Sequence, residues 1–118
     1  MSDTKDVIDR FNDAFGKKDV DAVMALMTDD VVFDNTIPPD GQKYVGQDAV
    51  RGFWQSLFGS NPNGRFDTEE MFCSGDRCTA LWLFTFDSTD PNSGHVRGVD
   101  VFKVRDGKVA EKFSYVKG

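Results

Sequence analysis

The spacing of apolar residues predicts three helices in the first half of the chain. A first helix is expected after Asp3 and ends at Gly16. Its apolar side consists of Val7, Ile8, Phe11, Ala14 and Phe15. Asp19 can cap a second helix, whose apolar side consists of Val20, Val23, Met24 and Met27. The third helix is predicted within "GQDAVRGFWQSLFG", with Val50, Phe53, Trp54, Leu57 and Phe58 facing inward.

The remaining segments have the pattern of strands and turns. "DDVVFDNTI" alternates as a short strand does, and "PPDGQKY" is typical of a loop. Four longer strands are predicted in "GRFDTEEMFCS", "DRCTALWLFTFDS", "GHVRGVDVFKV" and "KVAEKFSYVKG". The turns between them are short enough for an antiparallel meander. Helices followed by antiparallel strands predict an α+β fold in which the helices cover one face of a curved sheet.

The strand around residues 95–105 carries an acid on its apolar side. Asp100 shares that side with Val96, Gly98, Phe102 and Val104. An ionised acid there is costly unless it is paired, so burial should favour its neutral, hydrogen-bond-donating form. The alternative is a structural acid that is bonded to a backbone amide or paired with an arginine, such as Arg51 or Arg10.

The strand before it is apolar on both sides. One side carries Cys78, Ala80, Trp82, Phe84 and Phe86 and is expected to face the helices. Leu81 and Leu83 lie on the opposite side, which an antiparallel sheet usually turns to water. We therefore expect a homodimer through the outer face of the sheet; a few exposed leucines are the alternative.

Composition narrows the range of partners. The 118 residues suit a single domain, 1–118, and include 14 basic and 20 acidic residues, for a net charge of −6. No block of Lys or Arg offers a surface for nucleic acid or for an anionic membrane. The beginning of the chain does not resemble a signal peptide, and no apolar stretch is long enough to span a membrane, so we expect a cytoplasmic protein.

The residues that bind metals and cofactors are sparse. Cys73 and Cys78 would lie opposite each other on a hairpin, but without a secretion signal we expect free thiols. Together with the single histidine, His95, they match no metal-ligand spacing. No glycine-rich phosphate loop is present either. We therefore expect neither a metal nor a cofactor.

Three segments resemble a known family. "ALMTDDVVFDN", "VGQDAVRGFWQSLF" and "GVDVFKVRDGKVAEKFSYV", in this order, resemble the SnoaL-like and ketosteroid-isomerase-like proteins of the nuclear transport factor 2-like superfamily. The resemblance implies a conical α+β barrel, in which three N-terminal helices are packed in a strongly curved, mainly antiparallel sheet. It also implies an apolar pocket at the open end of the cone, commonly in a dimer.

The resemblance to ketosteroid isomerase implies two catalytic acids. Asp34 falls where that enzyme has its general base, and Asp100 falls where it has a protonated acid that hydrogen-bonds to the enolate. Phe11 stands where a tyrosine of the oxyanion hole is expected and cannot donate a hydrogen bond. Losing one such donor typically costs on the order of 10²–10³ in rate, so ordinary steroid isomerase activity is not expected.

The resemblance and the many aromatic residues together give a candidate substrate-binding set. We expect a small hydrophobic molecule to contact Phe11, Phe15, Trp54, Phe58, Trp82, Phe84, Phe86, Phe102 and Ser114. Asn35 could orient the substrate or satisfy the local backbone. Two functions stay open: cofactor-independent acid–base catalysis of the isomerase, cyclase or lyase type on a carbonyl compound, or a non-catalytic ligand-binding or protein-interaction domain.

Overall fold

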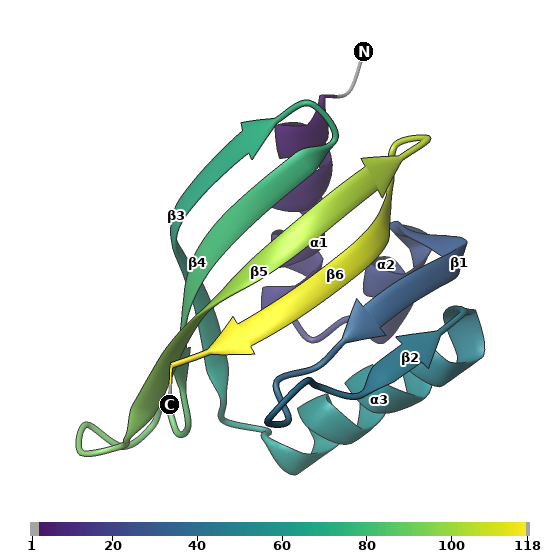
Figure 1. Ribbon diagram of the computed structural model, residues 1–118. Helices are drawn as coiled ribbons and strands as arrows, with labels where there is room; N and C mark the ends of the chain where they lie inside the picture. The colour runs from purple at the N-terminus through teal and green to yellow at the C-terminus, as the bar shows by residue number, and fades with distance from the viewer. Residues whose placement is uncertain (1–2, 118) are drawn as a thin grey trace.

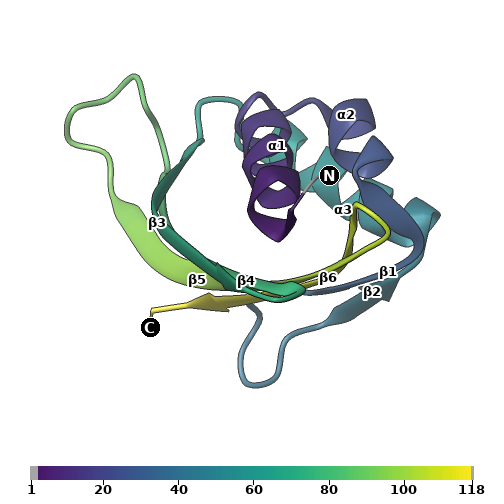
Figure 2. The same cartoon turned by 90° about the horizontal axis from the view of Figure 1, so that it is seen from above.

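The computed structural model describes residues 3–117, in which helices lie on the concave side of a curved sheet (Figures 1 and 2). The helices are α1 (Thr4–Gly16), α2 (Val20–Ala25) and α3 (Gln47–Ser60). The strands are β1 (Met27–Asp34), β2 (Lys43–Val45), β3 (Arg65–Ser74), β4 (Arg77–Thr85), β5 (His95–Arg105) and β6 (Lys108–Val116). Figure 2 shows α1 within the curve of the sheet, with α3 beside β1 and β2.

The sheet has the strand order β2-β1-β6-β5-β4-β3 and is not closed into a barrel. Strands β3 to β6 form the predicted antiparallel meander. The first strand, β1, lies parallel to β6, which places the early part of the chain beside its last strand. The architecture confirms the predicted α+β fold with a strongly curved, mainly antiparallel sheet.

The predicted apolar sides of α1 and α3 form the core under the sheet. All five apolar residues predicted for α1 are buried, and the side chain of Asp3 caps the helix by accepting from the amide of Asp6 at 2.8 Å. Several boundaries differ from the prediction; β1 ends at Asp34 and not at Ile37, and β4 ends at Thr85 and not at Ser88. Met27 begins β1 instead of continuing α2, and residues 43–45 form β2 because they pair with Val32–Asp34.

The hairpin of β3 and β4 contains a disulfide, which we did not expect. Cys73 and Cys78 are directly opposed in the register, with Cα atoms 4.0 Å apart, and their sulfur atoms are bonded. The two-residue turn Gly75-Asp76 produces this opposition, and Gly75 there has a φ of +59°. The expectation of free thiols was wrong, because the local hairpin alone brings the two side chains within bonding distance.

Among residues 3–117, no helix has the length and apolar character needed to cross a membrane.

Candidate functional site

An aromatic cavity of about 250 Å³ lies between the helices and the concave face of the sheet. Its walls are formed largely by side chains of α1, α3 and the inner face of β3 and β4, among them Phe11, Phe15, Phe53, Trp54, Phe66, Trp82 and Phe84. The rings pack edge-on and tilted against one another; those of Phe15 and Trp54 are 5.0 Å apart. Most of the wall therefore offers no polar group to a ligand.

A chain of three polar side chains crosses the floor of this cavity. Lys112 and Ser114 come from β6, and Asp100 comes from β5; their exposed fractions are 5%, 8% and 8%. The hydroxyl of Ser114 donates to Asp100 Oδ1 at 2.6 Å, and Lys112 Nζ donates to Ser114 Oγ at 3.0 Å. Lys112 Nζ also lies 3.3 Å from Asp100 Oδ2. The arrangement is a buried ion pair that is bridged by a hydroxyl.

Aromatic rings surround the amine of Lys112. Its Nζ lies 4.9 Å from the ring centre of Phe33, 5.2 Å from that of Trp54 and 5.4 Å from that of Phe15. These distances are within the range of cation–π attraction. Burial nevertheless lowers the pKa of the Lys112 ammonium, and the charge and hydrogen bond of Asp100 offset only part of that effect.

The partner of Asp100 differs from both sequence-based alternatives. We expected either a neutral acid or a structural acid with an arginine or backbone partner, but the partner is Lys112. Arg51 forms an ion pair with Asp21 instead, at 2.5 Å. The ammonium supplies the opposite charge that a buried carboxylate requires, so a neutral Asp100 is not needed to explain its burial.

Sequence reasoning missed Lys112, although a signal for it was available. In β6 the inner face carries Ala110, Lys112, Ser114 and Val116, and the outer face carries Glu111, Phe113 and Tyr115. Once Ser114 is placed opposite Asp100, the period of two requires Lys112 to face inward as well.

Three N–H groups of cavity-lining residues have no hydrogen-bond partner among the described residues. They are Nδ2 of Asn35 and Nε1 of Trp54 and of Trp82. The oxygen of Asn35 is already occupied, because it accepts from the amides of Ile37 at 3.1 Å and Gln42 at 2.8 Å. Buried polar groups are nearly always satisfied, so three unpaired donor nitrogens in residues around one cavity are an unusual feature of this structure.

Asp34 does not line the cavity, in contrast to its neighbours Phe33 and Asn35. Its cross-strand partner on β6 is Phe113, on the outer face of the sheet. The carboxylate lies under the loop after β1, where a Cβ on Gly41 would come within 2.2 Å of Asp34 Oδ1. The structure therefore does not bring Asp34 and Asp100 together in one cavity, as the two-acid hypothesis requires, because alternation along β1 turns Asp34 away.

Most of the candidate substrate-binding residues lie at the cavity. Those that line it are Phe11, Phe15, Trp54, Trp82, Phe84 and Ser114. Three others do not. Phe102 is fully buried against Phe11, Phe58 packs in the core against Phe15, and Phe86 is 48% exposed at the end of β4. Whether the lining residues bind a substrate stays a prediction.

In the described part of the chain, no group of three or more His, Cys, Asp or Glu side chains is placed to hold a metal ion.

Comparison with known proteins agrees with this architecture. The family model for the SnoaL-like domain matches residues 8–112. An NTF2-like protein of unknown function from Mesorhizobium loti is 38% identical, covers 98% of this chain and 91% of its own, and superposes with a TM-score of 0.83. A search of the curated proteins found no match.

Two more distant structures share the fold. A proposed polyketide cyclase from Xanthomonas campestris pv. campestris is 22% identical, with a TM-score of 0.77, and the match covers 97% of this chain and 90% of that one. A proposed ketosteroid isomerase from Kribbella flavida is 16% identical, with a TM-score of 0.81 and coverage of 98% and 78%. The family match over residues 8–112 and the Mesorhizobium loti relative show that the chain belongs to the SnoaL-like family of NTF2-like proteins.

Proposed function

We propose that this protein catalyses cofactor-independent proton transfer next to the carbonyl group of a small, largely apolar compound, as an isomerase or cyclase does. The observation that carries the proposal is the buried pair of Asp100 and Lys112 at the floor of an aromatic cavity. A base and a cationic donor held side by side are what removal of a proton from a carbon next to a carbonyl requires.

Each member of the pair has a role in this reaction. Asp100, which contacts Ser114 and Lys112, accepts the proton from carbon. Lys112 donates to the carbonyl oxygen and stabilises the negative charge that develops there. With Nζ and Oδ2 only 3.3 Å apart, one carbonyl group and its neighbouring carbon can contact both. Asp100 then returns the proton to another atom of the substrate.

The lining of the cavity favours a carbonyl compound over a pure hydrocarbon. The N–H groups of Asn35, Trp54 and Trp82 lack acceptors among the described residues, and ligand oxygens would supply them. The names of the polyketide cyclase and ketosteroid isomerase structures also refer to ketone-bearing compounds. Neither name identifies the compound on which this protein acts.

Exchange of carbon-bound hydrogen for deuterium tests the proposal. Phenylacetone, a small aromatic ketone, is incubated with the protein in D₂O and followed by NMR. The native protein should accelerate the exchange, and Asp100→Asn should reduce that acceleration by roughly 10²–10⁴. Asp34→Asn is the matched control and should retain it. Exchange that depends on Asp34 instead of Asp100 would overturn the assignment of the base.

One observation favours a second function, non-catalytic binding of the same class of ligand. Phe11 lines the cavity but brings no hydroxyl, where ketosteroid isomerases are expected to have a tyrosine. Saturable binding of phenylacetone with no acceleration of exchange would favour this second function over the first.

A further inference from the structure

We propose that Lys112 is a nucleophile that forms a Schiff base with an aldehyde or ketone bound in the cavity. This inference rests on the proposed carbonyl-binding function but goes beyond it, because proton transfer alone needs Lys112 only as a hydrogen-bond donor. A covalent bond to Lys112 would make the protein an amine catalyst or a covalent binder of carbonyl compounds.

The position of the amine suits this role. Lys112 projects from the middle of β6 into the cavity, and its Nζ contacts Ser114 and Asp100 on one side. On the other side lie the rings of Phe33 and Trp54, which line the same cavity. A planar carbonyl compound that enters between the rings therefore meets the nitrogen directly.

Burial also shifts the protonation equilibrium of Lys112 toward the neutral amine, the form that attacks a carbonyl. Burial lowers the pKa of Lys112, and Asp100 compensates only in part. The titratable groups that line the cavity are Asp67, Asp100 and Lys112. Asp67 is engaged by Arg65 at 2.9 Å and is 43% exposed, which leaves Asp100 as the only charge in contact with the amine among the described residues.

Each step can be balanced with the groups present. Lys112 gives a proton to Asp100, and the nitrogen lone pair then forms a bond to the carbonyl carbon as the carbonyl π electrons move to oxygen. The oxygen takes up a second proton, which the attacking nitrogen releases. Asp100, through Ser114, delivers a proton to the resulting hydroxyl group, which leaves as water. The product is a protonated imine with the carboxylate of Asp100 as counter-ion, and no oxidant or reductant is consumed.

The apolar walls stabilise this product. Formation of the imine releases water, and hydrolysis requires water to return to the same carbon. Aromatic side chains cover the amine on several sides, which limits the access of water. The alternative is a static ion pair in which Lys112 only neutralises Asp100. It predicts an amine that reacts no faster than the exposed lysines.

Reductive trapping distinguishes the two. The native protein is incubated with phenylacetone and sodium cyanoborohydride near neutral pH, and the modified lysines are identified by peptide mass spectrometry. We expect Lys112 to be modified first and faster than an exposed lysine, because its lowered pKa raises the neutral fraction of the amine. Lys112→Met should lose this adduct, and Lys108→Met, an exposed lysine of the same strand, should keep it.

A second measurement does not depend on the variants. Trapping is repeated on the native sequence unfolded in urea, where the preference for Lys112 should disappear. Equal modification of Lys112 and the exposed lysines in the folded protein would overturn the proposal. Acceleration of deuterium exchange without an adduct at Lys112 would also overturn it while leaving the proposed function intact. An adduct without exchange would support covalent binding and refute the acid–base function.

Discussion

Asn35 uses the two ends of its side-chain amide differently. Its oxygen accepts from the amides of Ile37 and Gln42 and so holds the loop after β1. Its nitrogen has no partner among the described residues and lies in the cavity wall. The sequence left open whether Asn35 serves the backbone or the substrate. The structure confirms the backbone role, and a ligand contact of the amide nitrogen stays a prediction.

Asn35→Asp separates these two contributions. A carboxylate can still accept from both loop amides but has no N–H to donate, so ligand affinity should fall by roughly 1–3 kcal/mol. Because Asn35 is buried, the added charge should also lower the free energy of unfolding, which urea denaturation measures separately. Phenylacetone binding can be followed by quenching of tryptophan fluorescence, because both tryptophans of the chain, Trp54 and Trp82, line the cavity. Asn35→Ala, which also loses the loop bonds, should destabilise the protein as well. Unchanged affinity in Asn35→Asp would exclude the nitrogen as a ligand contact.

At the level of single residues, sequence reasoning succeeded where alternation was combined with an unusual residue. Asp100 was recognised because an acid stood among apolar neighbours in one strand, and it does line the cavity. Lys112 was missed because a lysine in a strand with charged neighbours is normally exposed. Asp34 was predicted to line the cavity from the family resemblance and from its place at the end of a strand, beside the Pro38-Pro39 loop. Alternation along the chain would have excluded it, because Phe33 in β1 and Asn35 just after β1 both line the cavity.

Among the elements, the corner between α2, β1 and α3 depends on Gln47 at the start of α3. Its side-chain nitrogen lies within hydrogen-bond distance of the carbonyls of Met24 at 3.2 Å, Met27 at 3.0 Å and Thr28 at 3.1 Å. The carbonyl of Met24 belongs to the last turn of α2, and those of Met27 and Thr28 belong to the start of β1. One side chain therefore attaches α3 to the turn that precedes β1.

Gln47→Glu should weaken this corner. The carboxylate cannot donate and would face carbonyl oxygens, so the free energy of unfolding should fall by roughly 1–3 kcal/mol, as measured by urea denaturation. Gln55→Glu makes the same chemical change at an exposed position of the same helix and should have little effect. Equal stability of the two variants would show that the Gln47 contacts are energetically unimportant.

Periodicity predicted most elements because each buries one face. The five inward positions of α1 and the alternation of β4 and β5 are direct consequences of packing against a common core. The pairing of β1 with β6 could not be derived in this way, since it joins residues 27–34 to residues 109–113. Likewise β2 is only three residues long and shows no pattern of its own; its pairing with β1 defines it.

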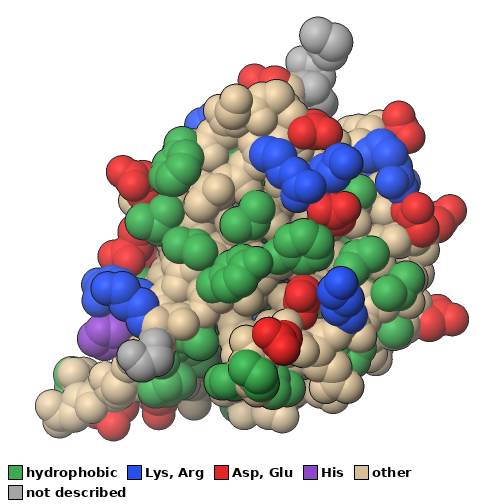
Figure 3. Space-filling view, viewed as in Figure 1, with side chains coloured by type: hydrophobic (Ala, Val, Ile, Leu, Met, Phe, Trp, Pro, Cys, Tyr) green, Lys and Arg blue, Asp and Glu red, His purple; other side chains and the backbone are tan. Residues whose placement is uncertain are grey.

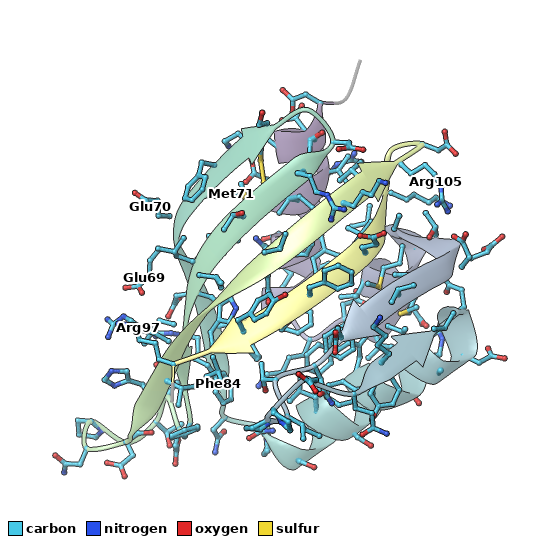
Figure 4. All side chains as sticks on the ribbon, viewed as in Figure 1. Glu69, Glu70, Met71, Phe84, Arg97 and Arg105 are labelled. Carbon is cyan, nitrogen blue, oxygen red and sulfur yellow. A yellow bond between two sulfur atoms is a disulfide. The ribbon has the colours of Figure 1, made fainter. Side chains whose placement is uncertain are left out.

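On the scale of the whole molecule, the convex face of the sheet carries a band of apolar side chains (Figure 3). The band includes the directly opposed pairs Leu81 with Val99, Val99 with Tyr115 and Val101 with Phe113. Phe72 of β3, opposite Thr79, extends it. Ion pairs border it: Glu69 with Arg97, seen side by side in Figure 4, and Arg77 with Glu111. Because the border contains both signs of charge, a second copy related by a two-fold axis can match it.

We therefore propose a homodimer through this face. Tyr115 is 58% exposed and lies beside Val99 in the band, so Tyr115→Glu should bury a charge in the interface and shift the protein to monomers. Sedimentation equilibrium measures this shift. Ile37→Glu, at an exposed apolar position in the loop after β1, is the control. A native protein that sediments as a monomer at all concentrations tested would refute the homodimer.

The ion pair of Lys112 and Asp100 also determines how ligand binding in the cavity responds to the salt concentration of the solution. Its two charges cancel almost completely at a distance, although the chain as a whole is acidic. A neutral guest would then experience neither long-range steering nor repulsion, and its affinity should hardly change as added salt shortens the screening length. Ligand affinity should depend on the shape and hydrogen-bonding capacity of the guest. It should be similar at low and at high salt concentration.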